Sequence, residues 1–151
     1  MSLRMPSIFL RCSLSFWRCF LTSVCSLLTV SASTYGATVT SVRVPDRDGH
    51  VGEVTLARDT LEDYRAGTPY YGALVGRVCN RVSGGGFALD ETFYPLAANG
   101  GSVHLHGGVH GFNSFVYAAE EIVGKSAVSL RLHRVSSDGE EGYPGTLTVD
   151  H

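Results

Sequence analysis

From Thr34 onward, the hydrophobic positions fall in short segments rich in valine, threonine and aromatic residues. Glycine, proline and aspartate separate these segments and mark turns, such as the one from Pro45 to Gly49. Asp90-Glu91 and Gly124-Lys125 each stand between two such segments and therefore predict hairpins. The predicted strands cover residues 36–44, 54–56, 87–89, 92–94, 115–123, 126–135 and 146–149.

The return strand of the second predicted hairpin shows the clearest alternation. Val128, Leu130 and Leu132 share one face, whereas Arg131 and His133 share the other. This period of two predicts a strand with one buried face and one face in water.

Only one helical turn is predicted. Asp59 is expected to cap it, with Glu62 reaching back to the cap, and Gly67 and Pro69 are expected to end it. Many short strands and almost no helix favour an all-β fold, an antiparallel β-sandwich. The strand at 146–149 has no successor, so an unpaired sheet edge and an incomplete sandwich are expected.

The first 33 residues differ from the rest. Arg18 precedes an apolar run over residues 19–30, and the small residues Ser31-Ala32-Ser33 follow, as in a signal peptide. A mitochondrial transit segment and an N-terminus with no address remain alternatives. The run is too short for a stable membrane span. We therefore expect a leader at 1–33 and one domain at 34–151.

Charge and cysteine usage exclude several classes of protein. The net charge of the 151 residues is −2, with 44% hydrophobic and 17% charged positions, so a general nucleic-acid binder is not expected. Three cysteines lie before residue 34, which leaves only Cys79 and excludes a disulfide-rich scaffold for the domain. Cys79 is expected to be a small buried residue.

Three of the six histidines, His104, His106 and His110, lie within seven positions among glycines. If residues 103–106 are extended, His104 and His106 face the same way. The cluster favours a polar, metal-free pocket, because imidazole exchanges protons near neutral pH. A metal site with three histidine ligands and a purely structural role remain alternatives, although the spacing matches no strong zinc motif.

Two further clusters carry unusual residues. The segment 76–82 holds Arg77, Cys79, Asn80 and Arg81, and its arginines alone indicate no more than exposed charge. The segment 138–145 places three carboxylates in four residues, which fits acid–base chemistry or cation binding, but its Gly-Tyr-Pro-Gly end favours a tight loop.

These clusters, in this order, resemble the aldose 1-epimerase (galactose mutarotase) family over about residues 34–150. The resemblance is carried by five ordered motifs. They are Thr34–Ser41, Val44–Gly49, Pro69–Gly72 with Gly76–Val82, Leu105–Gly108 with Gly111-Phe112, and Asp138–Gly145.

The resemblance implies a β-sandwich enzyme, an isomerase of hexose metabolism that interconverts the α and β anomers of galactose and glucose without a cofactor. It implies that Asn80, Arg81 and His106 contact the sugar. Arg77, His104 and His110 match no catalytic role and are expected to be structural. A cytoplasmic location follows from the family, and a secreted one if the leader is a cleaved signal peptide.

The family's principal acid, a histidine, and its base, a glutamate, are expected to lie beyond His151, so no catalytic residue is assigned in this sequence. Glu140 and Glu141 are not candidates for these roles. Three hypotheses therefore remain for the 151 residues: an epimerase by descent, a non-catalytic carbohydrate-binding module, and an unstable truncated product.

Overall fold

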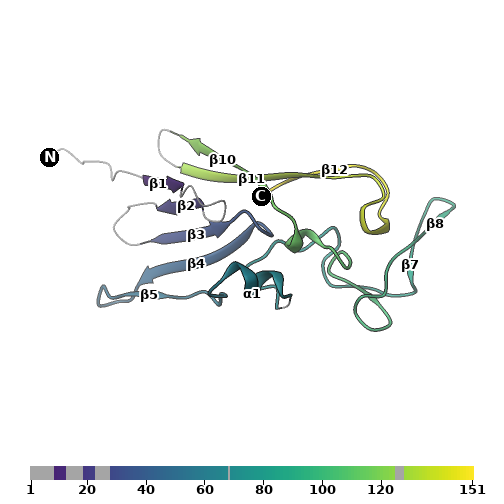
Figure 1. Ribbon diagram of the computed structural model, residues 1–151, viewed down its shortest axis with the longest axis horizontal. Helices are drawn as coiled ribbons and strands as arrows, with labels where there is room; N and C mark the ends of the chain where they lie inside the picture. Colours follow the sequence, from purple (N-terminus) through teal and green to yellow (C-terminus); the bar gives the residue numbers. More distant parts are fainter. Residues whose placement is uncertain (1–8, 13–18, 23–27, 68, 125–127) are drawn as a thin grey trace.

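The computed structural model describes residues 28–67, 69–124 and 128–151, together with the backbone of residues 9–12 and 19–22. Its regular structure consists almost entirely of antiparallel strands, so the predicted all-β class is confirmed (Figure 1). The larger sheet has five strands in sequence order, namely β1 (Phe9–Cys12), β2 (Cys19–Thr22), β3 (Thr29–Ser33), β4 (Thr38–Pro45) and β5 (Val51–Glu53).

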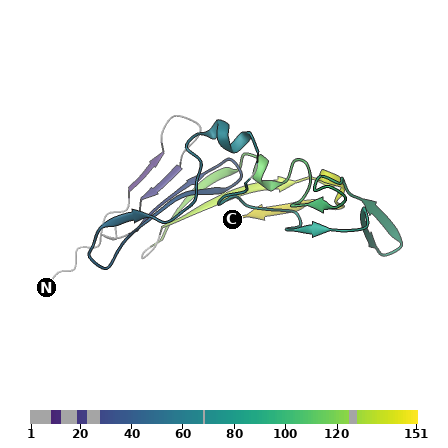
Figure 2. The same ribbon diagram turned by 90° about the horizontal axis from the view of Figure 1, so that it is seen from below.

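The second sheet has three strands, β10 (Ala118–Val123), β11 (Val128–Ser136) and β12 (Leu147–Asp150). Two short ladders pair β6 (Arg81–Val82) with β9 (His104–Leu105), and β7 (Gly86–Leu89) with β8 (Thr92–Pro95). The β7–β8 hairpin projects from one end of an elongated molecule (Figure 1, Figure 2). Both predicted hairpins and the strand near residue 147 are confirmed.

The core lies where the two larger sheets face each other. Leu132 of β11 packs with Ala37 and Tyr117, and each of the three is at most 2% exposed. A cavity between the sheets is lined by Val30 and Val39 on one side and by Leu130 and Leu132, among others, on the opposite side. The predicted buried face of β11 is therefore correct, and Arg131 on its other face is exposed.

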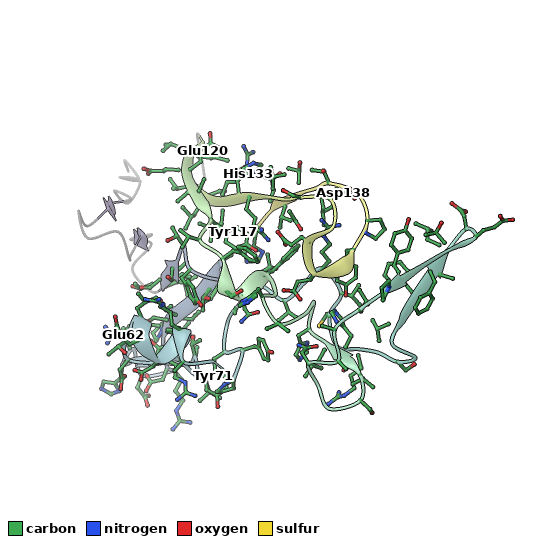
Figure 3. All side chains as sticks on the ribbon, turned by 45° about the vertical axis from the view of Figure 1, so that its right-hand side comes forward. Glu62, Tyr71, Tyr117, Glu120, His133 and Asp138 are labelled. Carbon is green, nitrogen blue, oxygen red and sulfur yellow. The ribbon has the colours of Figure 1, made fainter. Side chains whose placement is uncertain are left out.

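The charged side chain of Arg134 lies at the edge of this core. The guanidinium carbon of Arg134 lies 3.7 Å from the centroid of the Phe115 ring, and the same side chain forms a 2.6 Å ion pair with Glu140. Tyr117 lies beside it near the centre of the molecule (Figure 3). Burial raises the pKa of Tyr117 to about 12. The aromatic faces compensate the desolvated charge of Arg134.

Two local predictions were wrong. The helix α1 (Leu61–Arg65) is capped by Thr60, not by Asp59, because the Thr60 hydroxyl accepts from the backbone N–H of Asp63 and the Asp63 carboxylate accepts from the Thr60 N–H. The strand expected at 54–56 is instead β5, three residues earlier, and Val54 and Leu56 are exposed.

The expected leader overlaps the first sheet. β3 carries the small residues 31–33 and pairs with both β2 and β4. Residues 23–27 of the expected apolar run lie outside the described residues. The boundary at residue 33 stays a prediction. In the part of the chain that the structure covers, no helix has the length and apolar character needed to cross a bilayer.

β12 is an edge strand among the described residues, because its only ladder partner there is β11. That the sandwich is incomplete stays a prediction. Asp150 of this strand accepts a 2.9 Å hydrogen bond from His133 across the β11–β12 ladder.

Candidate functional site

The short β6–β9 ladder brings two of the sequence clusters together. Arg81 pairs with Leu105, so Asn80 and His106 lie next to each other at the end of the ladder. The backbone N–H of His106 donates to the carbonyl oxygen of Asn80 at 2.9 Å. All three residues that the resemblance assigns to the sugar therefore meet in one place, although they are up to 26 positions apart in the chain.

His106 sits in a tight turn and not in an extended strand. The backbone N–H of Gly108 donates to the Leu105 carbonyl at 3.2 Å, and both central residues, His106 and Gly107, have positive φ values of 54° and 87°. Positive φ at both central positions gives a tight reversal of the chain directly after β9. The expectation that His104 and His106 face the same way required an extended segment over residues 103–106, and that condition is not met, because β9 ends at Leu105.

Asn99 fixes this turn from the side. Its amide nitrogen donates to the carbonyls of Leu105 and Gly108, and its amide oxygen accepts from the backbone N–H of Leu105, each at 2.8 Å. One side chain thus satisfies three backbone groups of a segment that has few strand partners. The position of His106 is therefore set by hydrogen bonds on both sides of the turn.

The His106 ring has a defined orientation and tautomer. Its Nδ1 accepts a 3.1 Å hydrogen bond from the backbone N–H of Asn80, so the proton of the neutral ring lies on Nε2. The ring of Tyr70 packs against it edge-on, with centroids 4.7 Å apart and planes inclined by 64°. His106 is half-buried and presents an N–H donor at Nε2.

Asn80 and Arg81 form an exposed polar pair beside this ring. Arg81 Nη1 donates to the Asn80 side-chain oxygen at 2.9 Å. The other guanidinium N–H groups of Arg81 have no partner among the described residues. Such a fork suits adjacent oxygens of a polyhydroxylated ligand.

Arg77, four residues earlier, has a different role. All five of its guanidinium N–H donors are used: three nitrogens donate to the Ser136 hydroxyl and to the backbone oxygens of Ser136, Ser137, Pro144 and Gly145, at 2.6–3.1 Å. The structural role expected for Arg77 is confirmed. It ties the loop between β11 and β12 to the segment that carries Asn80 and Arg81.

The acidic cluster of that loop is structural as well (Figure 3 labels Asp138). Glu140 accepts from Arg134 and from the Ser136 hydroxyl, and Asp138 accepts from the backbone N–H of Gly145. Burial opposes ionisation of Glu140, but the hydrogen bonds from Arg134 and Ser136 outweigh it and lower the pKa of the carboxyl group. The loop interpretation of this cluster is therefore supported over the acid–base one.

Glu141 connects this loop to the histidine cluster. Its two carboxylate oxygens accept from the backbone N–H groups of Val109 and His110, at 2.9 and 2.8 Å. Gly107, in the histidine turn, packs tightly against the backbone of Gly76. A Cβ added at Gly107 would lie 1.6 Å from the carbonyl oxygen of Gly76. The glycines of this turn permit a backbone approach that no other residue allows.

The side chains of His104, His106 and His110 do not form a common metal-binding group in the described part of the chain. His104 is 1% exposed, and its ring nitrogens bond to the Ala97 carbonyl at 2.9 Å and to the Tyr143 hydroxyl at 2.8 Å, as expected for a structural residue. Burial raises the pKa of Tyr143. Within the described part of the chain, three potential metal ligands come together only at Asp46, Asp48 and His50 in an exposed turn.

His151, beyond which the resemblance places the acid and the base, directly follows β12. Its backbone N–H donates to the Leu132 carbonyl at 3.0 Å, and its own carbonyl accepts from the Leu132 N–H at 2.9 Å, so it prolongs the β11–β12 pairing. It lines the cavity between the two sheets, whose lining includes neither Arg81 nor His106. The placement of the acid and the base beyond His151 stays a prediction.

The prediction that Cys79 is buried was wrong. It is exposed and carries a free thiol, because it lies in the irregular stretch before β6 and not in a core-facing strand. Three supporting residues were not assigned any role from the sequence: Tyr70, Asn99 and Glu141. Tyr70 and Glu141 lie within the recognised motifs, but their partners are distant in sequence, and spacing alone does not reveal such contacts. Asn99 lies shortly before a motif and bonds to nearby residues, but its role depends on the turn that Leu105 and Gly108 form.

Comparison with known proteins extends these observations. The aldose 1-epimerase family model matches residues 22–150. Over 122 residues, the chain is 44% identical to galactose mutarotase from Bos taurus, a match that covers 81% of this chain and 34% of the relative. Over 120 residues it is 32% identical to aldose 1-epimerase from Escherichia coli (strain K12), with 80% and 34% coverage.

Solved structures agree. A galactose 1-epimerase from Lactobacillus acidophilus superimposes with a TM-score of 0.76 at 25% identity, covering 99% of this chain and 43% of that one. A GalM/aldose epimerase homologue from C. elegans gives the same score and identity over 88% and 40%. The chain spans about a third of the length of the curated relatives that it matches.

Proposed function

The chain belongs to the aldose 1-epimerase family, and from this premise we propose that residues 34–151 form the sugar-contacting part of a site for anomer interconversion of aldohexoses. Galactose is the first candidate ligand, because relatives that are 39–44% identical are named galactose mutarotases. Glucose is the second, since the family reaction is not limited to galactose. The proposal concerns binding by this stretch first and turnover second.

The observation that carries the proposal is the meeting of Asn80, Arg81 and His106 at the end of the β6–β9 ladder. Arg81 offers several N–H donors, Asn80 offers an amide, and His106 offers one N–H at Nε2. Neighbouring hydroxyl groups of a pyranose, with its ring oxygen, supply acceptors at matching spacing. The three side chains come from segments that the glycines and Asn99 hold in place.

The chemistry needs two proton transfers and no cofactor. A base removes the proton of the C1 hydroxyl, the bond between C1 and the ring oxygen breaks, and an acid protonates that oxygen. The resulting aldehyde turns and the ring closes on its other face, returning both protons. In this scheme His106 and Arg81 stabilise negative charge that develops on the ring oxygen as the bond breaks.

The residues for the two proton transfers are not assigned within this stretch. Glu140 and Glu141 are committed to Arg134, Ser136 and the backbone of Val109 and His110. Each missing proton-transfer group costs roughly 10²–10⁴-fold in rate. We therefore propose that the 151 residues bind aldohexose and contribute little turnover unless further residues complete the site.

Galactose titration followed by NMR tests the binding proposal. We expect Arg81→Leu to weaken galactose binding roughly tenfold or more, because hydrogen bonds from a charged donor are lost. Arg65→Leu serves as the control, since Arg65 is an exposed arginine in the last turn of α1. Equal galactose affinity of wild type and Arg81→Leu, with folding verified by a thermal melt, would exclude the proposed site.

Polarimetry of freshly dissolved α-galactose tests the proposal that the 151 residues contribute little turnover. We expect the 151 residues to give a rate close to that of buffer alone. A rate well above buffer that His106→Ala abolishes would show that this stretch performs the proton transfers itself. A chain without a cooperative melt would instead identify the unstable product among the three hypotheses.

A further inference from the structure

His106 needs more than one hydrogen bond to hold its ring in place. The bond from Asn80 N–H to Nδ1 fixes one nitrogen, but small rotations of the ring about its side-chain bonds would swing Nε2 through a wide arc. The proposed role requires Nε2–H to point at one sugar oxygen within a narrow range of directions. A second contact must therefore restrict the ring.

Tyr70 makes that contact from a different part of the fold. Its ring contacts the His106 ring edge-to-face, with the ring centroids 4.7 Å apart and the ring planes inclined by 64°. This is a favoured geometry for aromatic pairs. The two residues are separated by 36 positions in the sequence, and Tyr70 belongs to the segment that follows α1. The contact joins the histidine turn to the part of the chain that packs on the first sheet.

The backbone around Tyr70 is itself fixed. The carbonyl of Tyr70 accepts from the backbone N–H of Ala73 at 3.2 Å, and the carbonyl of Gly72 accepts from Val39 of β4 at 2.9 Å. An added Cβ at Gly72 would lie 2.1 Å from the Val39 carbonyl oxygen, so this segment is pressed against the sheet. Tyr70 therefore presents its ring from a rigid support.

We propose that Tyr70 is a positioning residue, whose ring holds the His106 imidazole so that Nε2–H faces the sugar. This inference rests on the proposed function of His106. It is the aromatic ring of Tyr70 that matters, and not its hydroxyl group, because the contact is between the rings. Tyr71, the next residue, is the natural comparison, since it is exposed and the Arg58 guanidinium, not a histidine, lies over its ring.

The test combines two measurements on the full 151-residue chain. The first is the ¹⁵N spectrum of the His106 ring, which reports the tautomer without any ligand. The second is galactose affinity. We expect Tyr70→Phe to match wild type in both, and Tyr70→Leu to give a mixed-tautomer or averaged His106 signal with affinity lowered roughly 3–10-fold. Tyr71→Leu should leave both unchanged.

The outcomes separate the two proposals. An unchanged His106 spectrum in a folded Tyr70→Leu variant would overturn the role of Tyr70, whatever galactose does. A changed spectrum in a chain that does not bind galactose even as wild type would retain the contact but contradict the proposed function and with it the positioning role. If Tyr70→Leu fails to fold, Tyr70→Met, with a flexible side chain of similar volume, takes its place.

Discussion

Asn80 and His106 are joined by two hydrogen bonds that run in opposite directions. The backbone N–H of Asn80 donates to His106 Nδ1 at 3.1 Å, and the backbone N–H of His106 donates to the Asn80 carbonyl at 2.9 Å. Asn80 has a φ of 64°, a value that asparagine tolerates better than most residues. The pair therefore links the tautomer of the histidine to the backbone conformation of its neighbour.

Arg77→Leu is expected to destabilise the fold strongly. The substitution removes five hydrogen bonds that hold the β11–β12 loop, and of the acceptors that lose Arg77 the Ser137 carbonyl keeps a donor in the backbone N–H of Glu140. We expect a loss of about 3 kcal/mol in the free energy of unfolding, measured by urea denaturation. Arg131→Leu, which breaks only the exposed pair with Glu120, should cost less than about 1 kcal/mol. Similar losses for both variants would contradict this account.

Glu141→Gln is expected to loosen the segment after the histidine turn. A glutamine offers one acceptor oxygen where Glu141 offers two, so one of the N–H groups of Val109 and His110 loses its partner. Amide hydrogen exchange of these two residues should become faster by about tenfold. Glu120→Gln, at an exposed position of β10, should leave both exchange rates unchanged. Protection that persists in Glu141→Gln would show that the carboxylate does not hold this segment.

Glu140 makes the stability of the fold depend on acid pH. Its pKa is lowered in the folded chain from the ordinary value of 4.5, since the bonds from Arg134 and Ser136 outweigh the effect of burial. A carboxyl group with a depressed folded pKa contributes stability that is fully present above its unfolded pKa. That contribution is lost as the pH falls through the folded value.

Urea denaturation of wild type and Glu140→Gln at several pH values measures this contribution. Wild type should be the more stable of the two at pH 7, and the difference should shrink below pH 4.5 as Glu140 becomes protonated. A difference that stays constant down to about pH 3 would contradict the proposed linkage.

The sequence predicted those strands whose signals are local, whereas β1, β2 and β3 fall in the expected leader and β5 lies three residues before its predicted position. The alternation of Val128, Leu130 and Leu132 identifies the buried face of β11, and Asp90-Glu91 between two short apolar segments identifies the β7–β8 hairpin. The helix cap was displaced by one residue because Asp59 and Thr60 are both good caps. The side chain of Asp63, one position later than expected, decides between them.

Contacts between distant segments were not predictable in this way. The turn at His106 depends on close packing of Gly107 against the distant Gly76, so residues 103–106 do not continue as a strand to His106. Cys79 was expected to be buried because free cysteines usually are, but its segment is irregular and exposed. The roles of Asn80, Arg81 and His106 came from the family resemblance, and they remain proposals.

The most direct test of the central claim is a galactose titration read at the His106 ring by ¹H–¹⁵N NMR. The account predicts that Nδ1 stays unprotonated throughout, that the Nε2 signal shifts as galactose binds, and that the shift requires the Arg81 side chain. His133, which pairs with Asp150 on the three-stranded sheet, serves as an internal control and should not respond. An Nε2 signal that is unchanged at saturating galactose, or a proton found on Nδ1, would contradict the account.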